Sequence, residues 1–255
     1  TLFMIDALKR TCKANNVIAV VPDLWYAAQD KTHGHREPIS IRLIGKLMEA
    51  AGCDHTITIE LHSEQIEGFF NSMDHLQGAP IVADYLKTTY QGSSGFVVVA
   101  PDGGAIRLRD NIVKNLGNLV RGTGEYSGLR DRARPDEKGK GKIGCDDVQN
   151  LDVIIYDDML RTGTTTINAA QAFKDAGANR VVAACAHMKN YGTDSFIKRL
   201  RRSNIDELIV FNTRPEIIRQ DHILRGKMTV LDISRYLAEA IKRYENGDTI
   251  REMIR

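Results

Sequence analysis

Several features that mark common protein classes are missing from this chain of 255 residues. No apolar run approaches the roughly 20 residues that a membrane-spanning helix needs, so we expect no membrane partner. A signal-peptide pattern is also missing. Basic and acidic residues nearly balance, 35 against 33, and the formal net charge of +2 gives no electrostatic case for a nucleic-acid partner.

Cysteine is also scarce and scattered. Cys12, Cys53, Cys145 and Cys185 show no Cys-x-x-Cys spacing. This pattern favours buried or idle thiols in a reducing cytoplasm over a zinc site or disulfides, and we therefore expect a cytoplasmic protein. An apolar content of 42% is enough for packed cores, and the length suits one large or two small domains.

What the chain does contain is an alternation of strand-like and helix-like segments. We place a domain boundary near the break formed by Gly78, Ala79 and Pro80. Strands that alternate with helices predict parallel sheets covered by helices, that is, an α/β fold. The expected strands are residues 17–22, 56–60, 96–100, 153–157, 180–186 and 207–211, and the expected helices are residues 1–10, 39–51, 104–116, 166–176, 193–202 and 234–245.

Residues 153–166 carry the most informative pattern. Four apolar residues predict a short strand that ends in the adjacent carboxylates Asp157 and Asp158, and a Thr-Gly-Thr-Thr turn then opens a helix near Ile167. Ligands of open α/β sheets bind beyond the carboxyl ends of strands, and free N–H groups at a helix start hold phosphate. Acid pairs and Thr-Gly helix caps are common separately. Together, in this order, they predict a phosphorylated-ribose site, with a metal or sugar hydroxyls on the acids.

The same stretch resembles the ribose-phosphate loop of the type I phosphoribosyltransferase fold. Four further segments are similar to the ribose-phosphate pyrophosphokinase (PRPP synthetase) family: Arg36–Ser40, Glu60–Phe70, Ala100–Gly104 and Leu237–Arg243. The resemblance implies two phosphoribosyltransferase-type domains, an ATP-side domain at residues 1–78 and a ribose-phosphate domain at residues 79–255. It also implies that the first strands of the N-terminal domain are missing, either because the chain is part of a longer protein or because it is naturally short.

The family reaction transfers a diphosphoryl group from ATP to the anomeric hydroxyl of ribose 5-phosphate, with Mg²⁺, and releases AMP. Such chemistry needs positioning and cations more than a covalent nucleophile. Family sites lie at subunit contacts, which implies a homo-oligomer. On the ATP side, the resemblance assigns nucleotide binding to Gln29, Asp30, Lys31 and His62, and a metal to His62 and Asp102. A structural histidine and a turn-forming aspartate are the alternatives.

On the ribose side, the resemblance assigns the sugar hydroxyls and a magnesium to Asp157 and Asp158. The 5-phosphate would lie against Thr162, Gly163, Thr164, Thr165 and Thr166.

Residues 117–147 are polar and glycine-rich, and we expect a long loop there, either a solvated linker or a mobile catalytic loop. Arg132 and Arg134 occupy the positions of the family's catalytic Lys-x-Arg pair, so the resemblance makes them catalytic together with His62. Arginine suits phosphate oxygens, but it is not a neutral exchange for lysine.

Four positions depart from the family pattern. Trp25 stands where the family has a small residue, Ala28 where it has an arginine, Arg161 where it has an aspartate, and Thr164 where it has a second glycine. Arg161 is either a solvent-facing residue or part of a pocket for a more highly charged substrate, such as ADP-ribose. The loss of a cation at Ala28 and the missing first strands keep open a non-catalytic regulatory homologue. The shared ribose-phosphate loop keeps open a phosphoribosyltransferase, although the segment Glu60–Phe70 has no place in that class.

Overall fold

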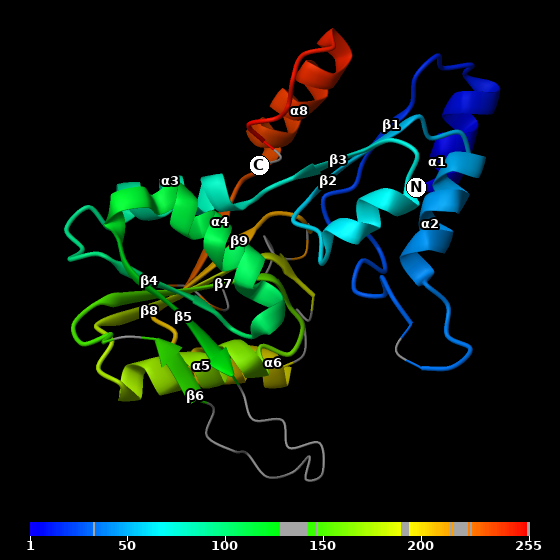
Figure 1. Ribbon diagram of the computed structural model, residues 1–255. Coiled ribbons are helices and arrows are strands. Elements are labelled where there is room, and N and C mark those ends of the chain that lie inside the picture. Colours follow the sequence, from blue (N-terminus) through cyan, green and yellow to red (C-terminus); the bar gives the residue numbers. More distant parts are fainter. Residues whose placement is uncertain are drawn as a thin grey trace. The chain divides into compact units, whose positions relative to one another are not determined.

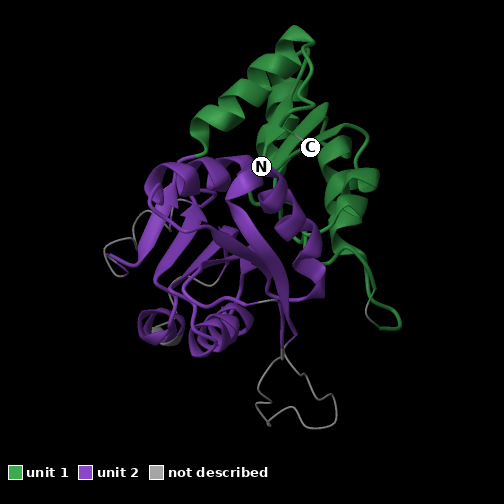
Figure 2. Cartoon of the chain, turned by 60° about the vertical axis from the view of Figure 1, so that its left-hand side comes forward, with its two compact units in different colours: residues 1–78, 233–255 green, residues 79–232 purple. Residues whose placement is uncertain are grey.

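The computed structural model describes residues 1–32, 34–127, 142–145, 147–189, 194–214, 216, 224 and 226–253. The chain divides into two compact units, which Figure 2 distinguishes by colour. Unit 1 holds residues 1–78 and 233–255, and unit 2 holds residues 79–232. Each unit has its own sheet, and both sheets are predominantly parallel with helices packed on them. The α/β fold class expected from the sequence is therefore confirmed.

Unit 1 is built on a parallel sheet in the order β1-β2-β3. Its core lies between this sheet and α2, whose Ile41 and Met48 are fully buried at the seven-residue spacing of one helix face. The elements of this unit are α1 (Leu2–Asp6), a π-helical turn (Ala7–Thr11), β1 (Ile18–Val20), α2 (Ser40–Ala50), β2 (His55–Ile59), a 3-10 helix (Glu64–Phe69), β3 (Met73–Leu76) and α8 (Ser234–Asn246).

Helix α8 corrects the predicted domain division, which placed residues 79–255 together. Tyr244 of α8 stacks on His55 of β2, with ring centroids 4.0 Å apart. The Met253 carbonyl accepts hydrogen bonds from the Gln77 N–H at 2.9 Å and from the Tyr236 hydroxyl at 3.1 Å. Residues 233–253 therefore belong to unit 1, where one face of α8 packs against its sheet.

Unit 2 is built on a seven-stranded sheet in the order β10-β9-β8-β7-β4-β5-β6, in which β6 is antiparallel to its neighbour. Figure 1 shows α3 and α4 on one face of this sheet and α5 and α6 on the other. The elements are α3 (Ala79–Thr89), β4 (Phe96–Ala100), a 3-10 turn (Gly103–Ala105), α4 (Ile106–Leu116), a 3-10 turn (Gly117–Leu119), β5 (Val120–Ser127), β6 (Lys142–Cys145), β7 (Asp152–Leu160), α5 (Thr164–Asp175), β8 (Arg180–Met188), α6 (Asp194–Arg202), β9 (Glu207–Phe211) and β10 (Met228–Leu231).

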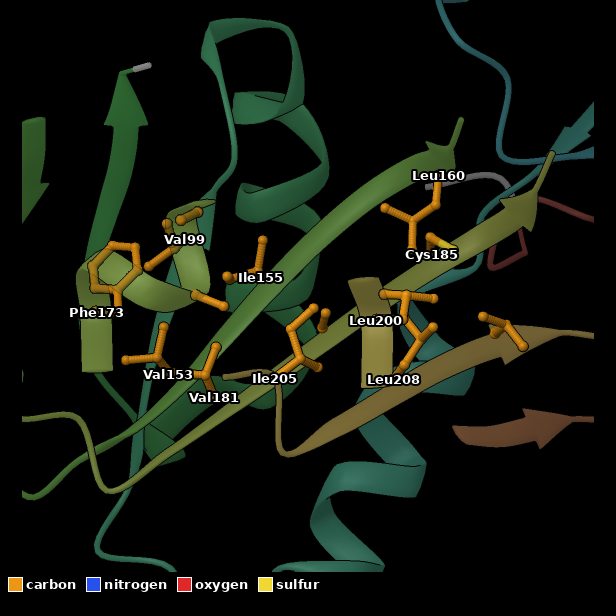
Figure 3. Packing of buried hydrophobic residues seen from close by; sticks show 14 of the residues in the cluster. Val99, Val153, Ile155, Leu160, Phe173, Val181, Cys185, Leu200, Ile205 and Leu208 are labelled. Carbon is orange, nitrogen blue, oxygen red and sulfur yellow. The ribbon is translucent and has the colours of Figure 1, made fainter. Parts of the chain in front are cut away.

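The core of unit 2 lies along β7 and β8. Both strands are buried over nearly their whole length, as expected for central strands covered on both faces. Phe173 of α5 and Leu200 of α6 belong to the same buried cluster as Ile155 and Val181, with Leu200 near Leu208 and Cys185 (Figure 3). This packing fixes α5, which follows the loop after β7, and α6, which contacts that loop.

The expectation of a long loop at residues 117–147 is wrong for its described parts. Residues 120–127 form β5, which pairs in parallel with β4, and residues 142–145 form β6 on its outer side. Gly124 allows β5 and β6 to come close together, because a Cβ atom at this position would lie 2.4 Å from the Cβ atom of Cys145. Strands β3 and β10 were not expected either, nor was α3, which begins at Ala79 and carries Pro80 in its first turn, where proline is tolerated.

Candidate active site

Acidic residues meet at the carboxyl edge of the unit 2 sheet. Asp102 follows β4, and Asp157 and Asp158 lie near the end of β7. Since β4 and β7 are parallel neighbours, their carboxyl ends lie at the same edge, and the charge of Asp102 acts on Asp157. The side chain of Asp102 also accepts a hydrogen bond from the Gly104 N–H at 2.9 Å, so it caps the turn after β4. The structure therefore brings together three of the predicted ribose-side and metal residues.

The Asp157 carboxyl lies in an unfavourable electrostatic position. Burial raises its pKa well above the ordinary value, and the neighbouring charges of Asp158 and Asp102 raise it further. A hydrogen bond from the Asp158 N–H to Asp157 Oδ1, 3.0 Å long, opposes this shift without cancelling it. Strand β7 continues to Leu160, beyond the predicted end, so both carboxylates belong to the strand itself. A bound cation would relieve this repulsion.

The turn after β7 forms an open, polar pocket. Its volume is about 280 Å³, and it is lined by Asp157 and residues 159–166, which include every predicted phosphate-binding residue. Helix α5 begins at Thr164, two residues earlier than expected, so the N–H groups of its first turn face the ligand side without intrahelical partners. Arg161 is exposed and lines the same pocket. The arrangement suits an anion at a helix start beside a carboxylate pair.

Gly163 is required in this turn for two reasons. Its φ of +67° lies in the left-handed region, which costs other residues energy. A Cβ atom at this position would also lie 2.9 Å from the ring of Phe196, which is fully buried in α6. Helix α6 therefore supports the turn from behind.

Arg199 of α6 contacts the same turn and was missed by the sequence reasoning. Its Nη2 donates to the Thr162 carbonyl at 2.7 Å, and its Nη1 donates to Thr164 Oγ1 at 3.2 Å. Arg199 lies three residues after Phe196, so both side chains share one face of the helix. The spacing was visible in the sequence, but nothing in it says that this face meets the turn at residues 162–164.

The predicted ATP-side residues lie in unit 1 around Asp30. This carboxylate is only 4% exposed and accepts hydrogen bonds from Ser63 Oγ at 2.6 Å and from Gln65 Nε2 at 2.7 Å. Burial would raise the pKa of Asp30, but these hydrogen bonds and the charge of His62 outweigh it and lower the pKa. Asp30 thus joins the turn at residues 29–31 to the segment that follows β2.

Of the other predicted ATP-side residues, Gln29, Lys31 and His62 are exposed. A buried histidine supports the segment that carries His62. His75 Nε2 accepts the Leu61 N–H at 2.9 Å, which leaves the proton on Nδ1 for Glu67, 2.9 Å away. His75 was not predicted as part of the site.

Several predictions meet the limits of the described residues. Arg132 and Arg134, the predicted catalytic pair, lie outside them. His62 and Asp102, the predicted metal pair, belong to different units. Among the described residues, no group of three or more His, Cys, Asp or Glu side chains has a geometry that would hold a metal ion. No helix in the same part of the chain is long and apolar enough to cross a membrane.

Comparison with known proteins gives consistent matches along the chain. Residues 1–52 match the N-terminal domain of ribose phosphate pyrophosphokinase, and residues 133–255 match the phosphoribosyl synthetase-associated domain. The ribose-phosphate pyrophosphokinase of Corynebacterium efficiens is 37% identical over 96% of this chain and 73% of its own length. The protein of the same name from Hyphomonas neptunium is 37% identical over 99% of this chain and 78% of its own length.

A solved structure agrees with these sequence matches. The crystal structure of phosphoribosylpyrophosphate synthetase from Mycobacterium smegmatis superposes with a TM-score of 0.83 at 33% identity. The superposition covers 96% of this chain and 76% of that one.

Proposed function

Because this chain belongs to the ribose-phosphate pyrophosphokinase family, we propose that it transfers the diphosphoryl group of ATP to the anomeric hydroxyl of ribose 5-phosphate. The products are phosphoribosyl pyrophosphate (PRPP) and AMP. The observation that carries this proposal is a pocket in which a helix-start turn that can hold an anion lies beside the Asp157 carboxylate, whose neighbour in β7 is Asp158. A phosphate in the turn places a ribose ring against Asp157 and Asp158, whose oxygens accept hydrogen bonds from the 2- and 3-hydroxyls.

The same carboxylates fit a magnesium ion. Oxygen donors suit this cation, which binds through one or two carboxylates, waters and substrate phosphates rather than an all-protein cage. Burial and the charges of Asp158 and Asp102 raise the pKa of Asp157, and a cation held by one or two of these carboxylates would offset that repulsion. When bound, magnesium would neutralise the negative charge of the transferred phosphates.

The remaining roles concern the nucleotide. In unit 1, Asp30 holds the segment with His62 in place, and we assign Gln29, Asp30, Lys31 and His62 to ATP binding. His62 and Asp102 keep their proposed roles as metal ligands. In the transfer, the anomeric oxygen forms a bond to the β-phosphorus while the bond from that phosphorus to the α-phosphate oxygen breaks. Arg132 and Arg134 are proposed to stabilise the charge that develops, and the active form is proposed to be a homo-oligomer.

A second acceptor is favoured by one observation. Arg161 is exposed at the wall of the phosphate pocket, where a further phosphate attached to the ribose 5-position would meet its guanidinium. ADP-ribose has this chemistry. A regulatory homologue without activity is the remaining alternative, since Ala28 replaces a cation on the ATP side.

The test is AMP release from ATP and Mg²⁺, with ribose 5-phosphate and ADP-ribose in separate reactions and products identified by mass. Turnover with ribose 5-phosphate supports the proposal. Turnover with ADP-ribose alone would transfer it to the second acceptor. If neither acceptor leads to release of AMP, from a chain with the full native N-terminus, the regulatory alternative is favoured.

A further inference from the structure

Arg199 connects helix α6 to the phosphate turn across a separation of 35 positions in the chain. The side chain is exposed, yet its guanidinium makes two defined contacts, with the Thr162 carbonyl and with Thr164 Oγ1. A guanidinium carries its donors in a rigid fork, and here two terminal nitrogens hold the two sides of Gly163. Phe196, on the same helix face, packs behind that glycine.

The hydrogen bonds determine the direction in which the Thr164 hydroxyl points. A threonine oxygen can accept two hydrogen bonds and donate one. Thr164 Oγ1 accepts one from Arg199 Nη1 and one from the Thr162 hydroxyl, each at 3.2 Å. Since both acceptor positions are filled, the remaining hydrogen points away from these two partners. Thr164 lines the pocket, so this hydrogen is available to an anion there.

We propose that Arg199 is a positioning residue for phosphate recognition. It fixes the turn at residues 162–164 in its anion-binding form, orients the Thr164 hydroxyl as a donor, and adds positive charge beside the pocket. The role deepens the proposed function and rests on it. It gives this chain a preference for acceptors that carry a phosphate, through a residue that does not need to touch the reacting atoms.

The test compares binding of ribose 5-phosphate, inorganic phosphate and ATP by calorimetry in the full chain. Arg199→Met removes the charge and both hydrogen bonds, and Arg199→Lys keeps the charge with a single point of contact. Arg201→Met is the matched control, because Arg201 is an exposed arginine on the same helix that points to another side. A lost hydrogen bond to a charged group corresponds to about a tenfold change in affinity.

We expect Arg199→Met to weaken binding of ribose 5-phosphate and of inorganic phosphate about tenfold, with Arg199→Lys intermediate. ATP binding and the unfolding midpoint should stay within the range of the Arg201→Met control. In a Thr164→Val background the effect of Arg199→Met should shrink, because the hydroxyl through which it acts is gone. A Thr164→Ser background, which keeps the hydroxyl, should preserve it.

Unchanged ribose 5-phosphate binding in Arg199→Met would overturn the role. So would an equal loss for ATP with a lowered unfolding midpoint, which would indicate a merely structural residue. If the native chain binds phosphate but not ribose 5-phosphate, the proposed function fails, and the effect of Arg199→Met on phosphate binding alone tests the role of Arg199. If it binds neither, both are wrong.

Discussion

Replacement of Gly163 by alanine should destabilise the protein by about 2–5 kcal/mol, and the value has two parts. A left-handed backbone costs a residue with a Cβ atom about 1–2 kcal/mol. The new methyl group would lie 2.9 Å from the fully buried Phe196 ring, and such overpacking typically costs about 1–3 kcal/mol. The ring is fully buried, so the turn itself should shift, and affinity for ribose 5-phosphate should fall with the stability.

Gly247→Ala is the control for the backbone part. Gly247 has nearly the same conformation, with φ +72° and ψ +20°, but a Cβ atom at this position would have no neighbour within 4 Å, so only the backbone cost applies. Urea unfolding at neutral pH measures both variants. In a Phe196→Leu background, the extra cost of Gly163→Ala should disappear because the ring atoms are removed. Equal costs for the two glycines in the native background would refute the steric argument.

Three further predictions concern carboxylates. Asp157→Asn should lower turnover by roughly 10²–10³-fold. It should also raise stability at neutral pH, and this gain should shrink as the pH falls through the raised folded pKa of Asp157, a dependence that urea unfolding at several pH values would check. Asp30→Asn should lower the free energy of unfolding by about 1–3 kcal/mol at neutral pH and raise the KM for ATP. The folded pKa of Asp30 is lowered, so the wild type loses the stability that the ionised carboxylate contributes as the pH falls through that pKa. The difference in stability between Asp30→Asn and the wild type should therefore vanish in acid, which urea unfolding at several pH values would check. Asp152→Asn breaks the ion pair with Arg180 and should lower the free energy of unfolding in urea by about 2–3 kcal/mol. This loss is smaller than for breaking a fully buried ion pair, because Arg180 is 41% exposed.

The sequence predicted the site best where it is local. The strand, the two acids, the turn and the start of α5 follow one another within fourteen positions, residues 153–166, so their order alone predicts that they lie close together. Strand β7 extends beyond its predicted end to Leu160 because it pairs with β8, and α5 begins earlier than predicted, at Thr164. Local propensity does not contain that tertiary contribution.

What the sequence could not supply is contact between distant segments. Arg199 meets Thr164 because α6 joins the buried core of unit 2 through Phe196 and Leu200, and the packed face of a helix is not specified by its own residues. The return of α8 to β2 is a contact of the same kind. Strand β5 was missed because its glycines and polar residues lower strand propensity, although Gly124 is there to admit Cys145.

The most direct test of the central claim is to follow ATP, Mg²⁺ and ribose 5-phosphate by phosphorus NMR with the native chain. The account predicts loss of the ATP signals with equal growth of AMP and of a diphosphate attached to the sugar at its anomeric carbon. Formation of ADP with a single phosphate on the sugar, or hydrolysis of ATP without a phosphorylated anomeric carbon, would contradict it.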